Sequence, residues 1–199
     1  MKKINNIKIV IAIIIVVTFG LLFAWKSYVN SPARNPNNPL ANINLKIVDV
    51  NGEAEFTETT STEIDKSLLT IMLKKKDNNS EIFNYLKNMK VSSFDNMTFV
   101  QIRDNTAEKA INNQETIVND KFTELLKNDD RAQDVINDLH YMLEDDEEAN
   151  VYQVIEPNKN VKIGQKVQVK LAIPDDLISE YGLNVSPRTI QIQEGKQES

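Results

Sequence analysis

A run of 17 uncharged and mostly apolar residues, Ile9 to Trp25, lies between Lys8 and Lys26. As an α-helix it would be about 25 Å long, a little short of the ~30 Å hydrocarbon core of a bilayer, so the flanking lysines would extend to the interfaces. The pattern predicts a transmembrane helix over 9–25. The lysines that precede it predict a cytoplasmic tail over 1–8 and an extracellular remainder, because positive loops stay inside.

Two other interpretations of this segment, a cleaved signal peptide and a pilin-type amino terminus, fit the sequence less well than an uncleaved anchor. A cleaved signal peptide needs small residues after the apolar core, whereas the chain has Phe23, Ala24 and Trp25 there. A pilin-type amino terminus would carry a glutamate near the start of the apolar stretch, and the stretch has none. The uncleaved anchor therefore fits the sequence best.

Proline and asparagine dominate the next segment. Residues 30–42 contain three of the six prolines and five asparagines. This composition offers little apolar surface to offset the entropy of ordering. It predicts a semi-extended linker over 26–42 that holds a folded body away from the membrane. The polar residues 194–199 predict a disordered tail.

Residues 43–193 alternate between strand and helix patterns and predict one extracellular domain. Asn51-Gly52 between two β-rich runs predicts a hairpin within 43–59. Further strands are predicted at 97–103, 151–155, 165–173 and 188–193. The predicted fold class is α+β: an N-terminal transmembrane helix followed by a small β-sandwich or open antiparallel sheet with an inserted helical hairpin.

The helical part of this prediction has one ambiguous segment. Residues 62–76 have the spacing of a helix and the apolar density of a buried strand, and helix is preferred. Ser80 is expected to cap a short helix that extends to Met89. Apolar stripes from Asn105 to Leu125 and from Asp130 to Leu143 predict two longer helices, which form the helical hairpin.

Composition excludes several kinds of chemistry. The chain has no cysteine, which rules out disulfides, thiolate nucleophiles and Cys-ligated metals. Its one histidine, His140, lacks a base, nucleophile or metal ligand at local spacing, so a solvent-flanking or capping role is expected. The formal net charge of -6 argues against a nucleic-acid partner. We predict no catalytic, cofactor-binding or metal-binding residues and no cofactor.

Two runs of like charge are the other candidates for contacts. The acidic run Glu144 to Glu148 lacks the alternating ligands and the glycine of a calcium loop, so a solvated helix end is favoured over a cation or basic-partner contact. Lys74, Lys75 and Lys76 are able to contact anionic wall polymer or lipid headgroups. Such a triplet more often ends a helix, where it interacts with the helix dipole.

Part of the chain resembles a surface domain of Gram-positive bacteria of the Ig-like or β-rich repeat type, whose role is unassigned. The similarity rests on Asn51-Gly52-Glu53-Ala54-Glu55-Phe56 and on Ile163-Gly164-Gln165-Lys166, and it covers 43–59 and 161–193. It implies a position outside the cell behind one transmembrane helix or an acylated cysteine, and it implies no catalytic residue. The chain departs from the group where Lys162 to Gln165 replace Ser-Asn-Gly-Asp.

These observations predict a non-enzymatic, single-pass membrane protein that acts as a cell-surface binding module. Asn occurs 24 times, and heavy use of Asn, Ile and Lys is typical of an AT-rich, Gram-positive genome. The expected partners are membrane lipid, through the N-terminal helix, and another envelope protein or wall polymer. The alternative is an accessory subunit of a secretion, conjugation or competence assembly. An envelope hydrolase is the least favoured hypothesis.

Overall fold

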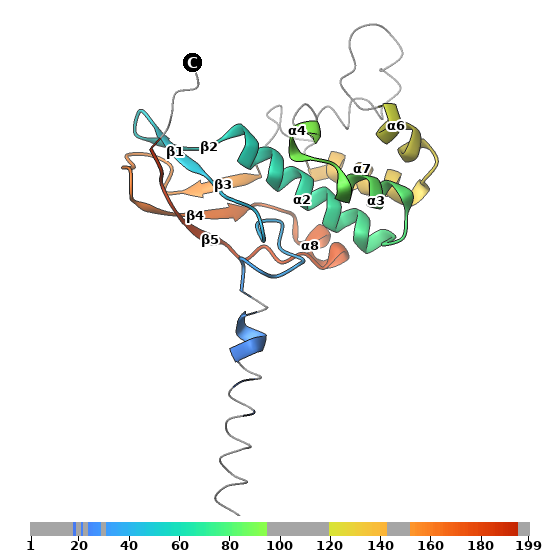
Figure 1. Cartoon of the computed structure of the whole chain (residues 1–199), viewed down its shortest axis with the longest axis horizontal. Helices are drawn as coiled ribbons and strands as arrows, with labels where there is room; N and C mark the ends of the chain where they lie inside the picture. Colours follow the sequence, from blue (N-terminus) through green and yellow to red (C-terminus); the bar gives the residue numbers. More distant parts are fainter. Residues whose placement is uncertain are drawn as a thin grey trace, which may run out of the picture.

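The structure is a computed structural model in which the described residues are 18, 21, 24–28, 31–94, 120–142 and 152–194. These residues form an α+β fold in which two small sheets occupy one end and several helices the other (Figure 1). The longest helix within these described residues begins beside the strands and extends into the helical end. It therefore connects the two parts of the fold.

The first sheet is a two-stranded antiparallel hairpin of β1 (Ile47–Val50) and β2 (Glu53–Phe56). Its turn residues, Asn51 and Gly52, have φ angles of 55° and 87°. Positive φ at both central residues is what a tight two-residue hairpin turn requires, and Asn-Gly accepts it at low cost. The predicted hairpin is confirmed.

The second sheet contains β3 (Gln153–Glu156), β4 (Lys166–Leu171) and β5 (Arg188–Gln191), antiparallel and in that order. Buried and exposed residues alternate along most of β4, as its sequence pattern predicts. The two sheets meet through single bridges, Val48 with Gln193 and Glu53 with Lys159. They therefore lie edge to edge and do not stack as the two layers of a sandwich.

The central helix is α2 (Glu58–Lys76). It begins after Thr57, whose side chain accepts a hydrogen bond from the Thr60 amide. Buried residues occupy most of its circumference, which is why its apolar positions were too dense to show a clear helical period. The preference for helix in this segment is confirmed, with a start at residue 58 and not 62.

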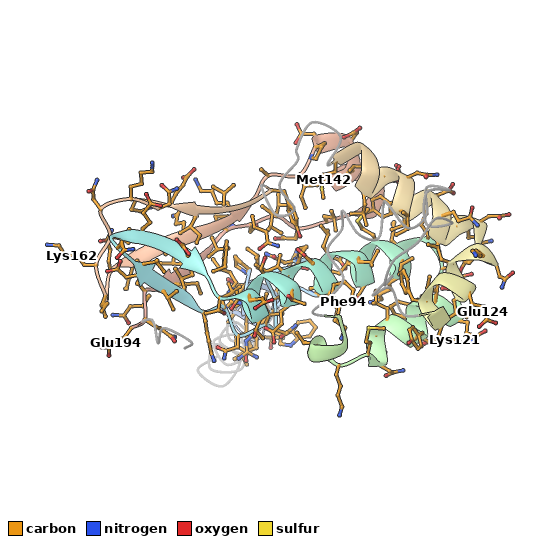
Figure 2. The ribbon with its side chains drawn as sticks, turned by 90° about the horizontal axis from the view of Figure 1, so that it is seen from above. Phe94, Lys121, Glu124, Met142, Lys162 and Glu194 are labelled. Carbon is orange, nitrogen blue, oxygen red and sulfur yellow. The ribbon has the colours of Figure 1, made fainter. Side chains whose placement is uncertain are left out.

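The other helices are shorter and surround α2. They are α3 (Glu81–Asn88), α4 (Val91–Phe94), α6 (Asp120–Lys127), α7 (Asp130–Met142) and α8 (Asp175–Tyr181). The helix α2 contacts α3, α4, α7 and α8, while α6 contacts α3 and α7. Figure 2 shows these helices gathered at the end of the molecule opposite Lys162.

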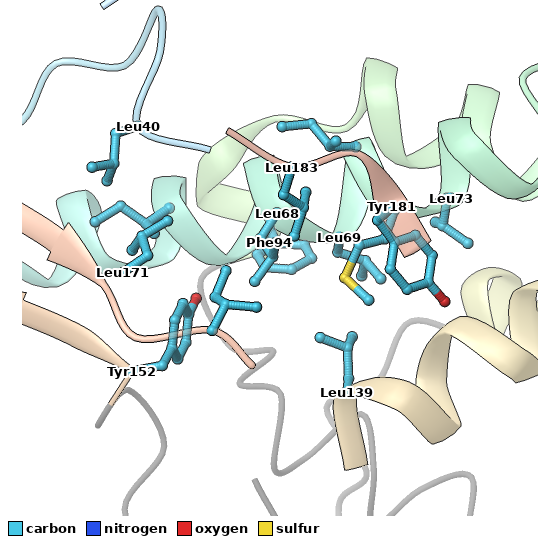
Figure 3. Packing of buried hydrophobic residues seen from close by; sticks show 14 of the residues in the cluster. Leu40, Leu68, Leu69, Leu73, Phe94, Leu139, Tyr152, Leu171, Tyr181 and Leu183 are labelled. Carbon is cyan, nitrogen blue, oxygen red and sulfur yellow. The ribbon is translucent and has the colours of Figure 1, made fainter. Parts of the chain in front are cut away.

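One continuous apolar cluster joins the sheets to the helices. The side chains of Leu68, Leu69 and Phe94 lie in its middle, and Tyr152 and Leu139 lie at its edge toward β3 and α7 (Figure 3). Phe94 comes from a helix of only four residues and is fully buried. The described elements therefore share a single core.

The predicted fold class is wrong in its first element. No helix within the described residues has the length and apolar character that crossing a membrane requires. Most of the range 9–25 lies outside those residues.

The prediction offered a small β-sandwich or an open antiparallel sheet, and the structure has two small antiparallel sheets that do not stack as a sandwich. The helices α6 and α7 do form a hairpin, broken where predicted, and Asp129 caps α7 by accepting a hydrogen bond from the Ala132 amide at 3.0 Å. They pack on α3 and α2 in a helical layer, because the buried surface of α2 offers the largest apolar contact. The predicted strand at 97–103 and the predicted helix start at Asn105 lie outside the described residues.

The segment predicted as a linker is packed into the fold at 38–41. Leu40 is 0% exposed and Asn38 is 1% exposed. The Asn38 amide donates to the Ser186 carbonyl at 2.9 Å and its oxygen accepts from the Leu40 amide at 2.8 Å. Composition missed this ordering because asparagine side chains supply the hydrogen bonds that regular secondary structure would otherwise supply.

Ser80 is the N-cap residue of α3. Its side chain accepts the Phe83 amide at 3.2 Å and so caps α3, as predicted. Ser80→Ala should lower the free energy of unfolding by about 1 kcal/mol, whereas Ser80→Asn, which retains a capping oxygen, should change it by only a few tenths. Urea denaturation of the three chains measures both effects. Equal losses in the two variants would show that the cap contributes nothing.

Candidate functional site

An open groove of about 710 Å³ runs between residues 36–44 and the helices α2, α3 and α4. It is the larger of the two hollows described here, and residues far apart in sequence form it. Its lining consists of Pro36, Asn38, Ala41, Asn42, Ile43, Asn44, Glu63, Lys66, Ser67, Thr70, Ile71, Lys74, Phe83, Lys87 and Val91.

One long wall of the groove is a single face of α2. Positions 63, 66, 67, 70, 71 and 74 follow the spacing of residues that share a face of an α-helix. At 1.5 Å per residue this wall is about 16 Å long. Leu68, Leu69 and Met72 hold the other side of α2 in the core, so the groove has a rigid wall.

The opposite wall is the segment 36–44, which Arg188 of β5 holds in place. The Arg188 Nη1 atom donates to the carbonyl oxygens of Leu40 at 2.5 Å and of Ile43 at 3.2 Å. The Asn184 amide donates to the Asn37 carbonyl at 2.8 Å. Burial lowers the pKa of Arg188 from its usual value. These bonds make the groove depend on the C-terminal part of the domain.

The lining is basic although the chain is acidic. Three lysines and one glutamate line the groove, whereas the whole chain has a formal net charge of -6. The Lys66 ammonium donates to the Met89 carbonyl, and burial lowers the pKa of Lys66, while the nearby Glu63 charge acts in the opposite direction. Lys74 and Lys87 are exposed. The groove therefore offers positive charge to an anionic group.

The floor between these charges is apolar. Ile71 and Phe83 are buried, and Ile43 and Val91 are half-buried. The Lys87 Nζ atom lies 5.8 Å from the centroid of the Phe83 ring, within the range of a cation–π contact. Apolar surface in a partly open groove binds a ligand that also has apolar groups.

The described lining is suited to binding and lacks a paired nucleophile and base. The Thr70 hydroxyl donates to the Lys66 carbonyl at 2.6 Å, and the Lys66 ammonium is bonded to a carbonyl. A serine or threonine nucleophile would need a base within hydrogen-bond reach of its hydroxyl. Among the described residues, no group of three or more His, Cys, Asp or Glu is placed to hold a metal ion.

A second polar cluster lies on the opposite side of α2. Asp65 is 3% exposed and accepts hydrogen bonds from the Tyr152 hydroxyl at 2.5 Å and from the Gln153 amide at 2.5 Å. Gln153 Oε1 also accepts from the Ser61 hydroxyl at 3.0 Å. These bonds tie α2 to β3 and to the residue before it.

Burial controls the charge of this cluster. It raises the pKa of Asp65 to about 7, although the hydrogen bonds from Tyr152 and Gln153 act to lower it. The pKa of Tyr152 lies well above its usual value because the hydroxyl is buried and the Asp65 charge is close. The position of Asp65, three and four residues before Leu68 and Leu69 on an apolar face, is a sequence signal for a buried carboxylate.

Of the residues that the sequence singled out, the structure describes the side chains of the lysine triplet alone. His140 lies in α7, but its side chain is not among those that the structure describes. Residues 144–148 lie outside the described residues. The lysine triplet ends α2 as predicted, but only Lys74 lines the groove. The Lys76 ammonium pairs with Glu180 at 2.5 Å and lies 5.3 Å from the Tyr181 ring centroid.

A smaller hollow of about 410 Å³ between α3, α6 and α7 is lined by four acidic side chains, by Arg131 and by uncharged residues. Arg131 donates to Asp77 at 2.9 Å there.

Lys66 and Lys87 are groove residues that were not predicted. Lys66, Thr70 and Lys74 are spaced by four, so the helical period places them on one face. No such signal exists for Lys87, because α3 is brought beside α2 only by the packing of Ile82, Phe83 and Leu86.

Comparisons of the chain with models of protein families, with curated proteins and with solved structures found no match. The resemblance to a Gram-positive surface domain stays a prediction. A function for the groove is therefore argued from the residues that line it.

Proposed function

We propose that the protein is a non-enzymatic binding module of the bacterial cell surface and that it holds its partner in the groove between α2, α3, α4 and residues 36–44. The observation that carries the proposal is a basic, apolar-floored groove on an acidic chain. A positively lined hollow attracts an oppositely charged partner and excludes like-charged ones. The proposed partner in the groove is another envelope protein or a wall polymer, and membrane lipid is the proposed partner of the N-terminal segment.

Support for a surface location comes from the sequence. The apolar run Ile9 to Trp25, with more lysines before it than directly after it, is the sequence feature that favours a location at the cell surface. The Arg34 Cζ atom lies 4.1 Å from the centroid of the Tyr28 ring. Both residues belong to the stretch of chain that follows this run and precedes the groove wall at 36–44.

The alternative role, an accessory subunit of a larger assembly, would favour an apolar patch on the helical hairpin. Within the described residues, the exposed large hydrophobic side chains are Leu21, Trp25, Tyr28, Val50 and Ile163. None of these lies on α6 or α7. This distribution favours the binding module.

Site-specific photocrosslinking in intact cells tests the proposal. A photoreactive residue at Thr70, on the groove wall, should give an adduct that is lost when Lys74 and Lys87 are both replaced by glutamate. The same residue at Glu55, exposed on β2, should give none. Adducts of equal yield at both positions, or none at Thr70, would contradict a role for the groove.

A further inference from the structure

The groove combines two features that recognise different parts of one ligand. Lys74 and Lys87 project positive charge from two different helices, and both are exposed. The half-buried side chains of Ile43 and Val91, with the buried Ile71 and Phe83 behind them, make the lining apolar between these charges. A ligand that uses the whole groove must therefore alternate anionic and apolar groups along its length.

We infer that the groove binds an acidic peptide segment in extended conformation, with carboxylates at Lys74 and Lys87 and apolar side chains on the floor. The inference rests on the proposed function and specifies the chemical class of its partner. Side chains of an extended peptide point alternately to opposite sides, so acidic and apolar residues face different parts of the groove.

The dimensions of the groove agree with this occupant. The wall formed by α2 is about 16 Å long, which corresponds to about five residues of an extended chain at ~3.3 Å per residue. Ser67, Asn42 and Asn44 place hydrogen-bonding side chains along the same groove, and a peptide backbone needs such partners. The volume of about 710 Å³ lies within the usual range for ligand sites.

An anionic polymer such as polyphosphate would match the lysines of the groove but not its apolar floor. Phosphate groups would pair with the lysines but would give no apolar contact to the half-buried side chains of Ile43 and Val91. Burying an anion against apolar surface costs free energy, because the anion loses hydration and gains nothing from those side chains. The apolar floor therefore favours a peptide.

Fluorescence anisotropy with the full chain in a neutral detergent tests the inference. The probe is a labelled eight-residue peptide of alternating Glu and Leu. Replacing Lys74 and Lys87 together by glutamate should weaken its binding at least tenfold. Lys66 is left intact because its bond to the Met89 carbonyl contributes to packing.

The matched control is the pair Lys75→Glu and Lys162→Glu. It changes the net charge by the same amount, and both lysines are exposed and outside the groove lining. This control should change the affinity less than twofold. A tenfold loss in the control as well would show that net charge alone drives binding and would overturn the inference.

Two further probes separate the peptide from other anions. A peptide of alternating Glu and Ser should bind at least tenfold more weakly than the Glu-Leu peptide, and polyphosphate of matched charge should not displace the latter. Equal binding of both peptides, or displacement by polyphosphate, would show a site for anions in general. That result would overturn the peptide inference and leave the proposed binding function standing. Absence of crosslinks at Thr70 would overturn the proposed function itself.

Discussion

Replacing Asp65 by asparagine should stabilise the folded protein at pH 8 and have little effect at pH 4. Asp65 is buried, and its pKa is about 7 in the folded chain compared with 3.8 for an unperturbed carboxyl. This difference corresponds to about 4 kcal/mol in the free energy of unfolding. Asparagine has a similar shape to the neutral acid and does not ionise.

The sign of this effect follows from proton binding. Between pH 4 and pH 7 the folded protein retains a proton on Asp65 that the unfolded chain releases. The contribution of the neutral, buried carboxyl is therefore fully present below about pH 4 and is lost as the pH rises through about 7. The wild-type chain should lose stability over this interval relative to the Asp65→Asn variant.

Urea denaturation at pH 4, 5, 6, 7 and 8 measures the difference between the two chains. The control is Glu55→Gln, a change at an exposed carboxylate of β2, which should leave the slope of the unfolding free energy against pH unchanged. A stability difference between wild type and Asp65→Asn that stays constant from pH 4 to pH 8 would contradict a raised pKa of Asp65.

Leu40→Ala should lower the free energy of unfolding by about 2–5 kcal/mol, the usual cost of truncating a fully buried leucine. Leu40 is 0% exposed and belongs to the same apolar cluster as the central helix (Figure 3). The main chain around it is bonded to Arg188 and Asn184, so the segment has limited freedom to fill the cavity. Urea denaturation at a fixed pH measures the loss.

The control for this prediction is Lys46→Ala, which removes an exposed side chain a few residues further along. It should change the free energy of unfolding by no more than about 0.5 kcal/mol. If Leu40→Ala is as mild as Lys46→Ala, residues 30–42 behave as the linker that their composition predicts, and the groove lacks a fixed wall.

Local features of this fold were predictable because their physics involves neighbours in the sequence. Asn51-Gly52 adopts positive φ angles that few other pairs tolerate, so the hairpin turn follows from two residues. Ser80 accepts an amide three residues later, so its cap is visible in the sequence. The alternation along β4 predicts a half-buried strand in the same way.

Other features depended on contacts between distant residues. The packing of 38–41 needed Ser186 and Arg188, which lie about 150 positions away and give no signal near residue 40. The helix α2 was ambiguous because it is buried on most sides by α3, α4, α7 and α8, so its sequence lacks a polar face of ordinary width.

Some features of the candidate site follow from the sequence, and others depend on tertiary packing. The amino-acid sequence alone determined the acidic charge, the absence of cysteine, the apolar run at 9–25 and the spacing by four of Lys66, Thr70 and Lys74. Only the tertiary structure brought residues 36–44 and Lys87 to the α2 face of these three residues and placed Tyr152 beside Asp65. Periodicity and turn chemistry act over a few residues, whereas a groove or a buried carboxyl is defined by which distant surfaces pack together.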